Sequence, residues 1–263
     1  MRVIVILALS LYSMCSISKE LGEILTEWNL SKTPIEEIYE LNEKSRAPNS
    51  YEDLRIKWDR HVIYKANGAL ELKINDNASR NTQLTIGDIT YSSIDKGEFG
   101  GELGYTHEGS YKPLLKGNVQ ELITDGPKLY ILEGLDHMLS RGAVYVIPNM
   151  KKPSTPQLVT LLPDSPKAGL ITKPGNLVVV GSNGLYFVSA NYLEIVYWNA
   201  FWSGIYLWGP TSIVKYEHKF LIGLPKGVAV VELEAPFHPP KIELYMTNEF
   251  NKSMQPTANA SAD

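Results

Sequence analysis

The sequence is poorest in cysteine, since Cys15 is the only one among 263 residues. Cys15 lies in an N-terminal segment that we expect to be removed. The remaining chain would then hold no disulfide, and thiol catalysis and cysteine-based zinc or iron–sulfur sites are excluded. Neither sign of charge dominates: the net charge is −4 and no run of five like charges occurs. This balance argues against nucleic acid as a partner, because that role needs a concentrated basic face.

Several motifs of known chemistry are absent as well. There is no Gly-x-Ser-x-Gly nucleophile elbow, since Gly181-Ser-Asn-Gly184 lacks the spacing. No glycine loop that could hold a phosphate precedes a helix, and no loop of alternating aspartates suggests calcium. The histidines show no i,i+2 or i,i+4 pairing; they are His61, His107, His137, His218 and His238. The sequence therefore predicts no metal site and no cofactor, and it favours a non-catalytic protein.

Long apolar runs are missing too. After Arg2, the apolar run from Val3 to Met14 is too short to span a bilayer comfortably, and small residues follow at Ser16 and Ser18. This pattern is typical of a secretory signal peptide over residues 1–18, so we expect a periplasmic or extracellular protein with no stable membrane span. The alternative is an uncut segment that anchors the chain, because the site is Ser-x-Ser rather than Ala-x-Ala.

Two other segments differ from the body of the chain. Residues 19–53 contain Thr33-Pro34-Ile35-Glu36, a capping-box start that predicts a helix from Pro34 to Lys44 in a helical N-terminal extension. Residues 248–263 are polar, rich in small residues and aperiodic, which predicts a disordered tail. The last part of this tail resembles those that arise when a reading frame runs into the recombination site of an integron gene cassette.

What the sequence does contain is a strand–turn–strand phrase written three times between residues 54 and 247. Each copy ends in a glycine, at Gly134, Gly181 and Gly223, and a second apolar strand follows. The spacing matches one four-stranded propeller blade. A more divergent copy precedes these three, and a fifth could combine residues 54–75 with a segment near the C-terminus. We therefore predict an all-β propeller of about four to five blades, with a β-sandwich as the alternative.

Residues 171–188 and 213–231 resemble blades of the two-component-regulator type of β-propeller. In that family a strand leads to a Gly-Asn turn, a second strand ends in glycine, and Gly-Leu or Gly-Val starts the third. The resemblance implies a ring of blades in a sensory or binding role. The chain departs from the pattern at the inserted residues 135–141 and at 216–218, where the expected turn residues are missing.

In propellers, the turns between second and third strands and the connectors between blades open on one face. That geometry predicts a binding face formed by residues 135–141, 182–183, 199–209 and 224–226. The candidate ligand-binding residues are Asp136, His137, Arg141, Asn183, Trp202, Trp208 and Lys226. Arg141 could form a bidentate pair with a carboxylate or phosphate, and exposed aromatic rings could stack on a sugar. Alternatively, these side chains fill the rim and the aromatic residues wedge between blades.

Three classes of function remain open on this reasoning. The favoured class is a non-catalytic binding protein for a small molecule, a glycan or a protein partner. The second is a hydrolase or lyase acting on a sugar or ester, with His137 as base and Asp136 or Glu98 orienting it. The third is a protein-docking scaffold with a broad apolar face.

Overall fold

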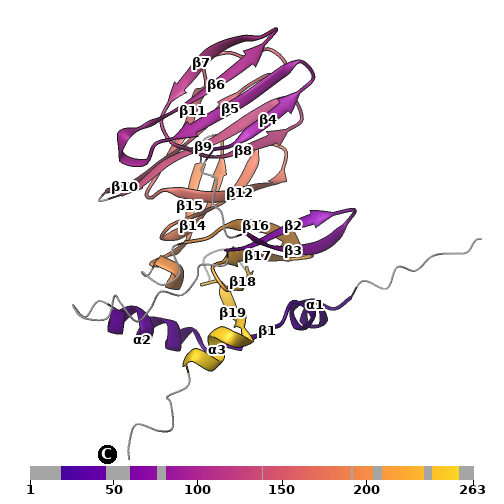
Figure 1. The fold of residues 1–263 in the computed structure, drawn as a ribbon, viewed down its shortest axis with the longest axis vertical. Helices are drawn as coiled ribbons and strands as arrows, with labels where there is room; N and C mark the ends of the chain where they lie inside the picture. The colour runs from indigo at the N-terminus through magenta and orange to yellow at the C-terminus, as the bar shows by residue number, and fades with distance from the viewer. Residues whose placement is uncertain are drawn as a thin grey trace, which may run out of the picture.

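The computed structural model describes residues 19–45, 60–75, 81–137, 139–190, 192–203, 209–233 and 239–254. They form mostly antiparallel β-sheet, laid out as consecutive sheets along the chain (Figure 1). The expected signal segment, residues 1–18, lies outside the described residues. Within the described ranges, no helix is both long and apolar enough to cross a membrane.

Three four-stranded sheets and one five-stranded sheet each contain four strands in sequential order, and we call these sets of four strands blades 1 to 4. Blade 1 consists of β4 (Gln83–Ile86), β5 (Ile89–Asp95), β6 (Gly101–His107) and β7 (Ser110–Lys116). Blade 2 consists of β8 (Val119–Asp125), β9 (Lys128–His137), β10 (Leu139–Ile147) and β11 (Gln157–Leu162). Blade 3 consists of β12 (Pro166–Lys173), β13 (Asn176–Gly181), β14 (Gly184–Ser189) and β15 (Tyr192–Trp198). Blade 4 consists of β16 (Ser212–Tyr216), β17 (Lys219–Leu224), β18 (Gly227–Glu232) and β19 (Lys241–Thr247).

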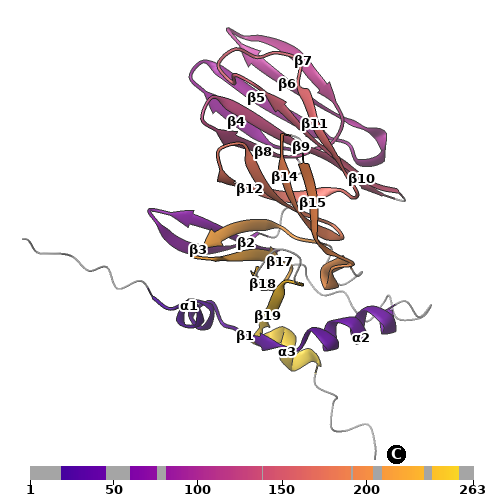
Figure 2. The same cartoon turned by 180° about the vertical axis from the view of Figure 1, so that it is seen from behind.

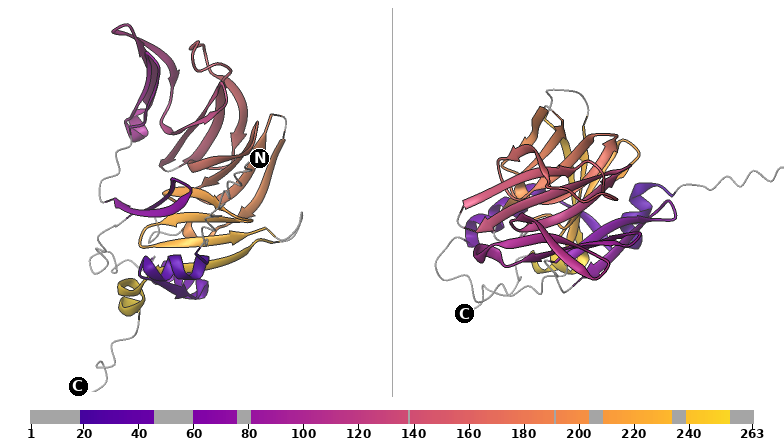
Figure 3. Two further views of the ribbon diagram at one scale, coloured as in Figure 1. Left: turned by 90° about the vertical axis from the view of Figure 1, so that its right-hand side faces the viewer. Right: turned by 90° about the horizontal axis from the view of Figure 1, so that it is seen from above.

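The blades succeed one another in an arc and do not form two facing layers (Figure 3). The first strands of neighbouring blades contact each other, β8 against β12 and β12 against β16, so these strands lie innermost. This arrangement confirms the predicted all-β propeller architecture with blade-like sheets, and the sandwich alternative is wrong.

Apolar side chains fill each space between neighbouring sheets. Strand β13 shows how one strand serves two cores, because Leu177 and Val179 pack toward blade 2 while Val178 and Val180 pack toward blade 4. A strand buried on both faces must be apolar at every position, which explains the continuous Leu-Val-Val-Val run. On the far side of blade 4, Leu221 packs against the hairpin residue Ile63.

Blade 1 is apolar on one face only. Ile89 and Tyr91 pack toward blade 2, whereas Thr90, between them on β5, points the other way and bonds Thr85 with 3.1 Å between the hydroxyl oxygens. A polar outer face is what the terminal unit of a stack of repeats needs to remain soluble. Blade 1 therefore ends the arc within the described part of the chain.

A two-stranded hairpin of β2 (Arg60–Ala66) and β3 (Ala69–Asn75) lies at the other end of the arc, beside blade 4. It turns at Asn67 and Gly68, both with positive φ (51° and 82°), as the Asn-Gly pair predicts. Strand β2 packs against β16 and β17. The fifth blade expected from this segment plus the C-terminal region is not formed, because β19 pairs within blade 4.

The repeated glycines are required by close packing rather than by unusual backbone angles. A side chain at Gly181 would place Cβ 2.0 Å from Asp164 Oδ1, in the connector between blades 2 and 3. Gly134 faces Ser165 of the same connector, and Gly223 faces Ser212 at the start of β16. Near the end of each of these second strands, an interblade connector therefore lies directly against the backbone. This contact explains the periodic glycine phrase in the sequence.

The terminal segments gather beside blade 4 (Figure 2). Strand β1 (Leu30–Thr33) pairs with β19, and the helices are α1 (Leu21–Glu27), α2 (Ile35–Ser45) and α3 (Asn248–Met254). Helix α2 matches the predicted helix to within one residue, and Ile38 is buried in the core between blades 3 and 4. The N-terminal extension is thus not helical throughout, because β1 belongs to the sheet.

The expectation of a disordered tail from residue 248 is wrong for residues 248–254, which form α3. Phe250 is buried, and Asn248 and Asn251 donate hydrogen bonds to Asn29 and Ser31 beside β1. Contacts with a distant part of the chain stabilise a helix whose sequence looks polar and aperiodic. The rest of the expected tail, residues 255–263, lies outside the described residues.

Candidate functional site

The turns between second and third strands and the interblade connectors meet at one edge of the blades, which we call the loop face. Its described parts are residues 96–100, 117–118, 163–165, 182–183, 199–203, 209–211 and 225–226. Backbone hydrogen bonds join them across blade boundaries: Ser182 N donates to Ser165 O at 2.9 Å, and Ala200 N donates to Asn183 O at 3.1 Å. Connectors far apart in sequence therefore share one surface, as the sequence analysis expects.

An exposed polar layer crosses the boundary between blades 2 and 3 on the loop face. Lys167 Nζ of β12 lies 2.9 Å from Asp136 Oδ2 of β9. The hydroxyls of Ser140 and Ser182 lie 3.1 Å apart, and Ser140 Oγ also accepts a hydrogen bond from Ser165 N at 2.9 Å. The end of the β9–β10 hairpin and the β13–β14 turn are thereby fixed to each other by polar side chains that face solvent.

A buried polar layer accompanies this exposed one. Asp164 is 1% exposed, and its Oδ2 accepts a hydrogen bond from Asn183 N. Burial raises the pKa of Asp164 to about 6, although Tyr186, the Asn183 amide and Lys167 act in the opposite direction. Asp136 also raises this pKa by charge repulsion. The carboxyl group therefore titrates within two pH units of neutrality.

Three atoms of this buried layer make no hydrogen bond of normal geometry with any described residue: Asp164 Oδ1, Ser165 Oγ and Tyr186 Oη. The Tyr186 hydroxyl nevertheless lies near enough to the Asp164 carboxylate to lower its pKa. Buried polar atoms without partners cost about 1–3 kcal/mol each. Buried polar atoms without partners are rare in protein cores, and a functional site is one place where they are retained.

A second ion pair lies on the loop face at the boundary between blades 1 and 2. Arg141 Nη1 lies 3.3 Å from Glu133 Oε1, and the Glu133 carboxylate is almost completely buried. Burial raises the pKa of Glu133, and the charge of Arg141 opposes that shift. The guanidinium is mostly exposed, so it neutralises a buried charge while presenting donors to solvent.

The predicted site residues separate into three groups. Asp136, Arg141 and Asn183 lie on the loop face around blade 2 and its boundary with blade 3. His137 is the last residue of β9 and pairs with Leu139, but its side chain is outside what the structure describes, as is the whole of Trp208. The remaining two, Trp202 and Lys226, are buried.

Trp202 is a core residue and not part of an exposed aromatic platform. Its side chain is 0% exposed, and Nε1 donates to Gly181 O at 3.1 Å. The Tyr197 and Phe201 rings meet it edge to face, with centroids 5.5 and 5.2 Å away. An aromatic-rich segment has the same composition whether it fills a core or coats a surface, so the sequence could not separate the two.

Lys226 is likewise not available to a ligand at the surface. It is 8% exposed and has a positive φ of 62° in the turn between β17 and β18. Its carbonyl accepts a hydrogen bond from Thr247 N at 2.8 Å. The residue therefore holds this turn against the end of β19.

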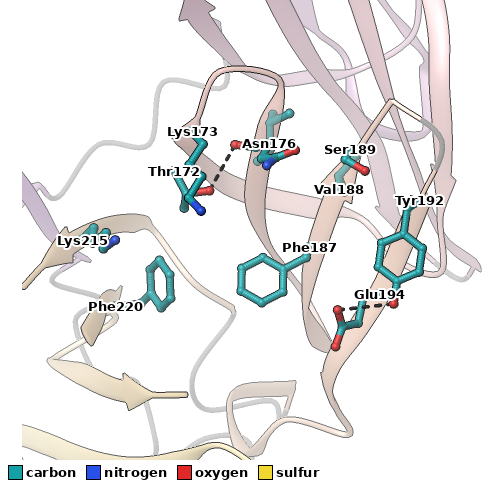
Figure 4. Close-up of a pocket in the computed structure, with 11 residues that line it drawn as sticks. Thr172, Lys173, Asn176, Phe187, Val188, Ser189, Tyr192, Glu194, Lys215 and Phe220 are labelled. Carbon is teal, nitrogen blue, oxygen red and sulfur yellow. Dashed lines mark hydrogen bonds between the residues drawn. The ribbon is translucent and has the colours of Figure 1, made fainter. Parts of the chain in front are cut away.

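A groove of about 380 Å³ lies between blades 3 and 4, at the edge opposite the loop face (Figure 4). The turns that border it join β12 to β13, β14 to β15 and β16 to β17. Phe187 and Phe220 lie at its centre, surrounded by polar and charged side chains from both blades: Thr172, Lys173, Asn176, Ser189, Tyr192, Glu194 and Lys215. The sequence did not predict this site. Its residues lie beside first-to-second and third-to-fourth turns, whereas the expected binding face uses the turns between second and third strands and the connectors between blades.

Among the described residues, no three histidine, cysteine, aspartate or glutamate side chains are grouped closely enough to hold a metal ion.

No family model matches this chain, and no curated protein matches its sequence. The resemblance to the two-component-regulator type of blade therefore stays a prediction. Distant structural matches exist. One is a bifunctional GH43-CE protein of Bacteroides eggerthii, at 13% identity and a TM-score of 0.35, covering 63% of this chain and 27% of that one.

Two further matches are similarly distant. The Xanthomonas campestris gluconolactonase XC5397 is 9% identical with a TM-score of 0.36, over 70% of this chain and 63% of that one. The exo-β-1,3-galactanase 1,3Gal43A of Clostridium thermocellum is 8% identical with a TM-score of 0.37, over 71% and 52%. This chain thus spans less than two thirds of the length of each of these proteins. At such scores the likeness carries no argument about activity or residue roles.

Proposed function

We propose that this chain is an exported, non-catalytic binding protein whose ligand is a small polar molecule or glycan held on the loop face. The observation that supports this proposal is the two-layer polar arrangement at the boundary of blades 2 and 3. An exposed layer with Asp136 and Lys167 crosses the same boundary as a buried layer built on Asp164.

The exposed layer alternates donors with acceptors over a short distance. Lys167 is cationic, Asp136 accepts hydrogen bonds, and the hydroxyls of Ser140 and Ser182 can do either. A polyhydroxylated ligand presents the same alternation. Because hydrogen bonds already fix these side chains to one another, little conformational entropy would be lost on binding.

The test is a thermal-shift screen of the purified protein against glycans and small metabolites. A ligand that binds the folded state raises the melting temperature; at a concentration of 100 Kd it stabilises the protein by about 2.7 kcal/mol. Asp136→Asn should weaken a true loop-face ligand about tenfold or more, because it removes the acceptor charge. Asp88→Asn, an exposed and ion-paired aspartate between β4 and β5 of blade 1, is the matched control and should leave the affinity unchanged.

Two results would contradict the proposal. A ligand that binds Asp136→Asn and wild-type protein equally does not use the loop face. Chemical turnover of a screened ligand, followed by proton NMR, would favour the hydrolase or lyase instead.

A further inference from the structure

The groove between blades 3 and 4 has the size and lining of a small-molecule site, and it lies away from the loop face. Its volume of about 380 Å³ falls in the range of about 300–1,000 Å³ that is usual for ligand pockets. Two different blades form it, so its shape depends on how those blades pack.

Two aromatic rings give the groove an apolar centre. Phe187 and Phe220 meet edge to face, with centroids 6.4 Å apart and ring planes at 66° (Figure 4). Leu177 and Val188 are buried beside them and also line the groove. Phe187 itself is only partly buried, so part of its ring is open to an apolar ligand.

Lysines from both blades border this apolar centre. Lys173 ends β12 in blade 3, and Lys215 lies in β16 of blade 4. Both are exposed, and neither forms an ion pair with any residue in the part of the chain that the structure describes. Two unpaired ammonium groups beside one apolar surface favour an anion that has an apolar body.

The side of the groove that faces away from the lysines is acidic. Figure 4 shows Glu194 and Tyr192 across Phe187 from Lys215, and Tyr192 Oη donates to Glu194 Oε2 at 3.4 Å. A carboxylate at that end would be repelled. The charges therefore orient an anionic ligand with its charged group toward the lysines.

We propose that this groove is a second binding site, for a small organic carboxylate whose aryl or alkyl body covers Phe187 while its charge lies between Lys173 and Lys215. This site is independent of the loop face and of the function proposed for it. Its occupant is recognised by one anionic group together with apolar contact, whereas the site proposed on the loop face offers polar and charged groups.

Three probes with one phenyl body and different charge test the proposal: phenylacetate, 2-phenylethanol and phenethylamine. Binding to the full chain is followed by ligand-observed NMR titration at low salt, because salt screens exposed charges. Phenylacetate should bind about tenfold more tightly than the alcohol, and the amine should bind most weakly.

Charge variants then assign the selectivity to residues. Lys173→Ala combined with Lys215→Ala should reduce phenylacetate affinity to that of the alcohol, with little change for the alcohol itself. Glu194→Gln should strengthen phenylacetate binding about twofold to fivefold. Lys151→Ala, an exposed lysine in the turn after β10, is the matched control and should change nothing. All of these side chains lie at the surface, so circular dichroism melting curves should coincide with that of the wild type.

Equal affinities for the three probes would overturn the proposal, because the groove would then not select charge. Binding of phenylacetate that survives the double lysine substitution would overturn it as well, since the anion would sit elsewhere. Absence of detectable binding of every probe at millimolar concentration would mean that the groove is not a site for this class of ligand.

Discussion

The boundary of blades 2 and 3 at the loop face differs from the boundary of blades 3 and 4 at the opposite edge. At the loop face, connectors from blades 2 and 4 lie directly against the backbone of blade 3, and hydrogen bonds such as Ser182 N to Ser165 O close the boundary. At the other edge, the turns of blades 3 and 4 stay apart and leave the groove around Phe187. The first boundary is thus a fixed polar surface, and the second is an open cavity with an apolar centre. At that second edge blades 2 and 3 still meet, since Gly175 N donates to Asp125 Oδ2 at 2.7 Å.

The difference shows what the repeated glycine phrase encodes. The phrase marks the edge where backbones approach most closely, since Gly181 leaves no room for a Cβ beside Asp164. Gly175, in a turn at the other edge, has nothing within 4 Å of such a Cβ and is needed only for its φ of +79°. The glycines that end the repeated phrase therefore mark close packing, and the open volume lies at the opposite edge of the blades.

The largest expected effect concerns Trp202, which lies in the core and not among the exposed residues of the loop face. Trp202→Ala should lower the free energy of unfolding by about 3–5 kcal/mol, because it leaves a cavity and an unpaired Gly181 carbonyl. Trp198→Ala is the control and should cost about 1 kcal/mol or less, since Trp198 is 43% exposed. Urea denaturation measures both. An unchanged urea midpoint for Trp202→Ala would contradict the core role and make Trp202 a candidate ligand contact again.

The second effect sharpens the contrast between the two glycines. Gly181→Ala should destabilise the protein by about 3 kcal/mol through overpacking, and Gly175→Ala by about 1 kcal/mol through backbone strain alone. Asp164→Ser should recover part of the first loss, because it removes the carboxylate that the new methyl group meets. A double-mutant cycle measures this coupling. No coupling between positions 164 and 181 would contradict the close contact.

The third effect is a pH dependence from the buried layer of the loop face. Burial raises the pKa of Asp164 to about 6 in the folded protein, from an unfolded value of about 3.9. The folded state therefore binds the proton more tightly, and this stabilisation is complete below about pH 4 and is lost as the pH rises through about 6.

Asp164→Asn should flatten the decline in stability between pH 4 and pH 7 by an amount on the order of 2 kcal/mol. Glu121, whose pKa burial raises to about 7, would leave a residual decline of the same sign. Guanidinium unfolding at several pH values gives the two profiles. Parallel profiles for the variant and the wild type would mean that Asp164 is ionised throughout this range.

The smallest effect concerns the exposed layer. Asp136→Asn should change the free energy of unfolding by about 0–1 kcal/mol, because the Asp136–Lys167 pair is partly open to solvent and screened by salt. Lys32→Ala, which removes the exposed pair between β1 and β19, should cost a similar amount. A loss above about 2 kcal/mol for Asp136→Asn would show that this pair holds blades 2 and 3 together, rather than lying on a surface ready for a ligand.

The architecture could be predicted because its causes are local. Close contact near the ends of second strands requires glycine at Gly134, Gly181 and Gly223, and burial on both faces requires the apolar run of β13. Helix α2 was predictable for the same reason, since its capping residues are adjacent in sequence.

The rest depends on contacts between distant residues. Helix α3 forms where the sequence looks disordered, because Asn251 bonds Ser31 across 220 positions. The role of Asp164 requires the Asn183 amide of the next turn, and the groove requires Phe187 of blade 3 to face Phe220 of blade 4. No pattern within one blade reveals these pairings.

The claim on which the account depends is that turns of neighbouring blades meet at one edge. A disulfide tests it directly: Ser140→Cys and Ser182→Cys are introduced together into a chain carrying Cys15→Ser, at hydroxyls that lie 3.1 Å apart. The account predicts rapid oxidation to an intramolecular disulfide, seen by mass spectrometry, while the pair Ser140→Cys and Ser189→Cys, at opposite edges of the blades, stays reduced. Free thiols in the first pair, or a cross-link in the second, would contradict it.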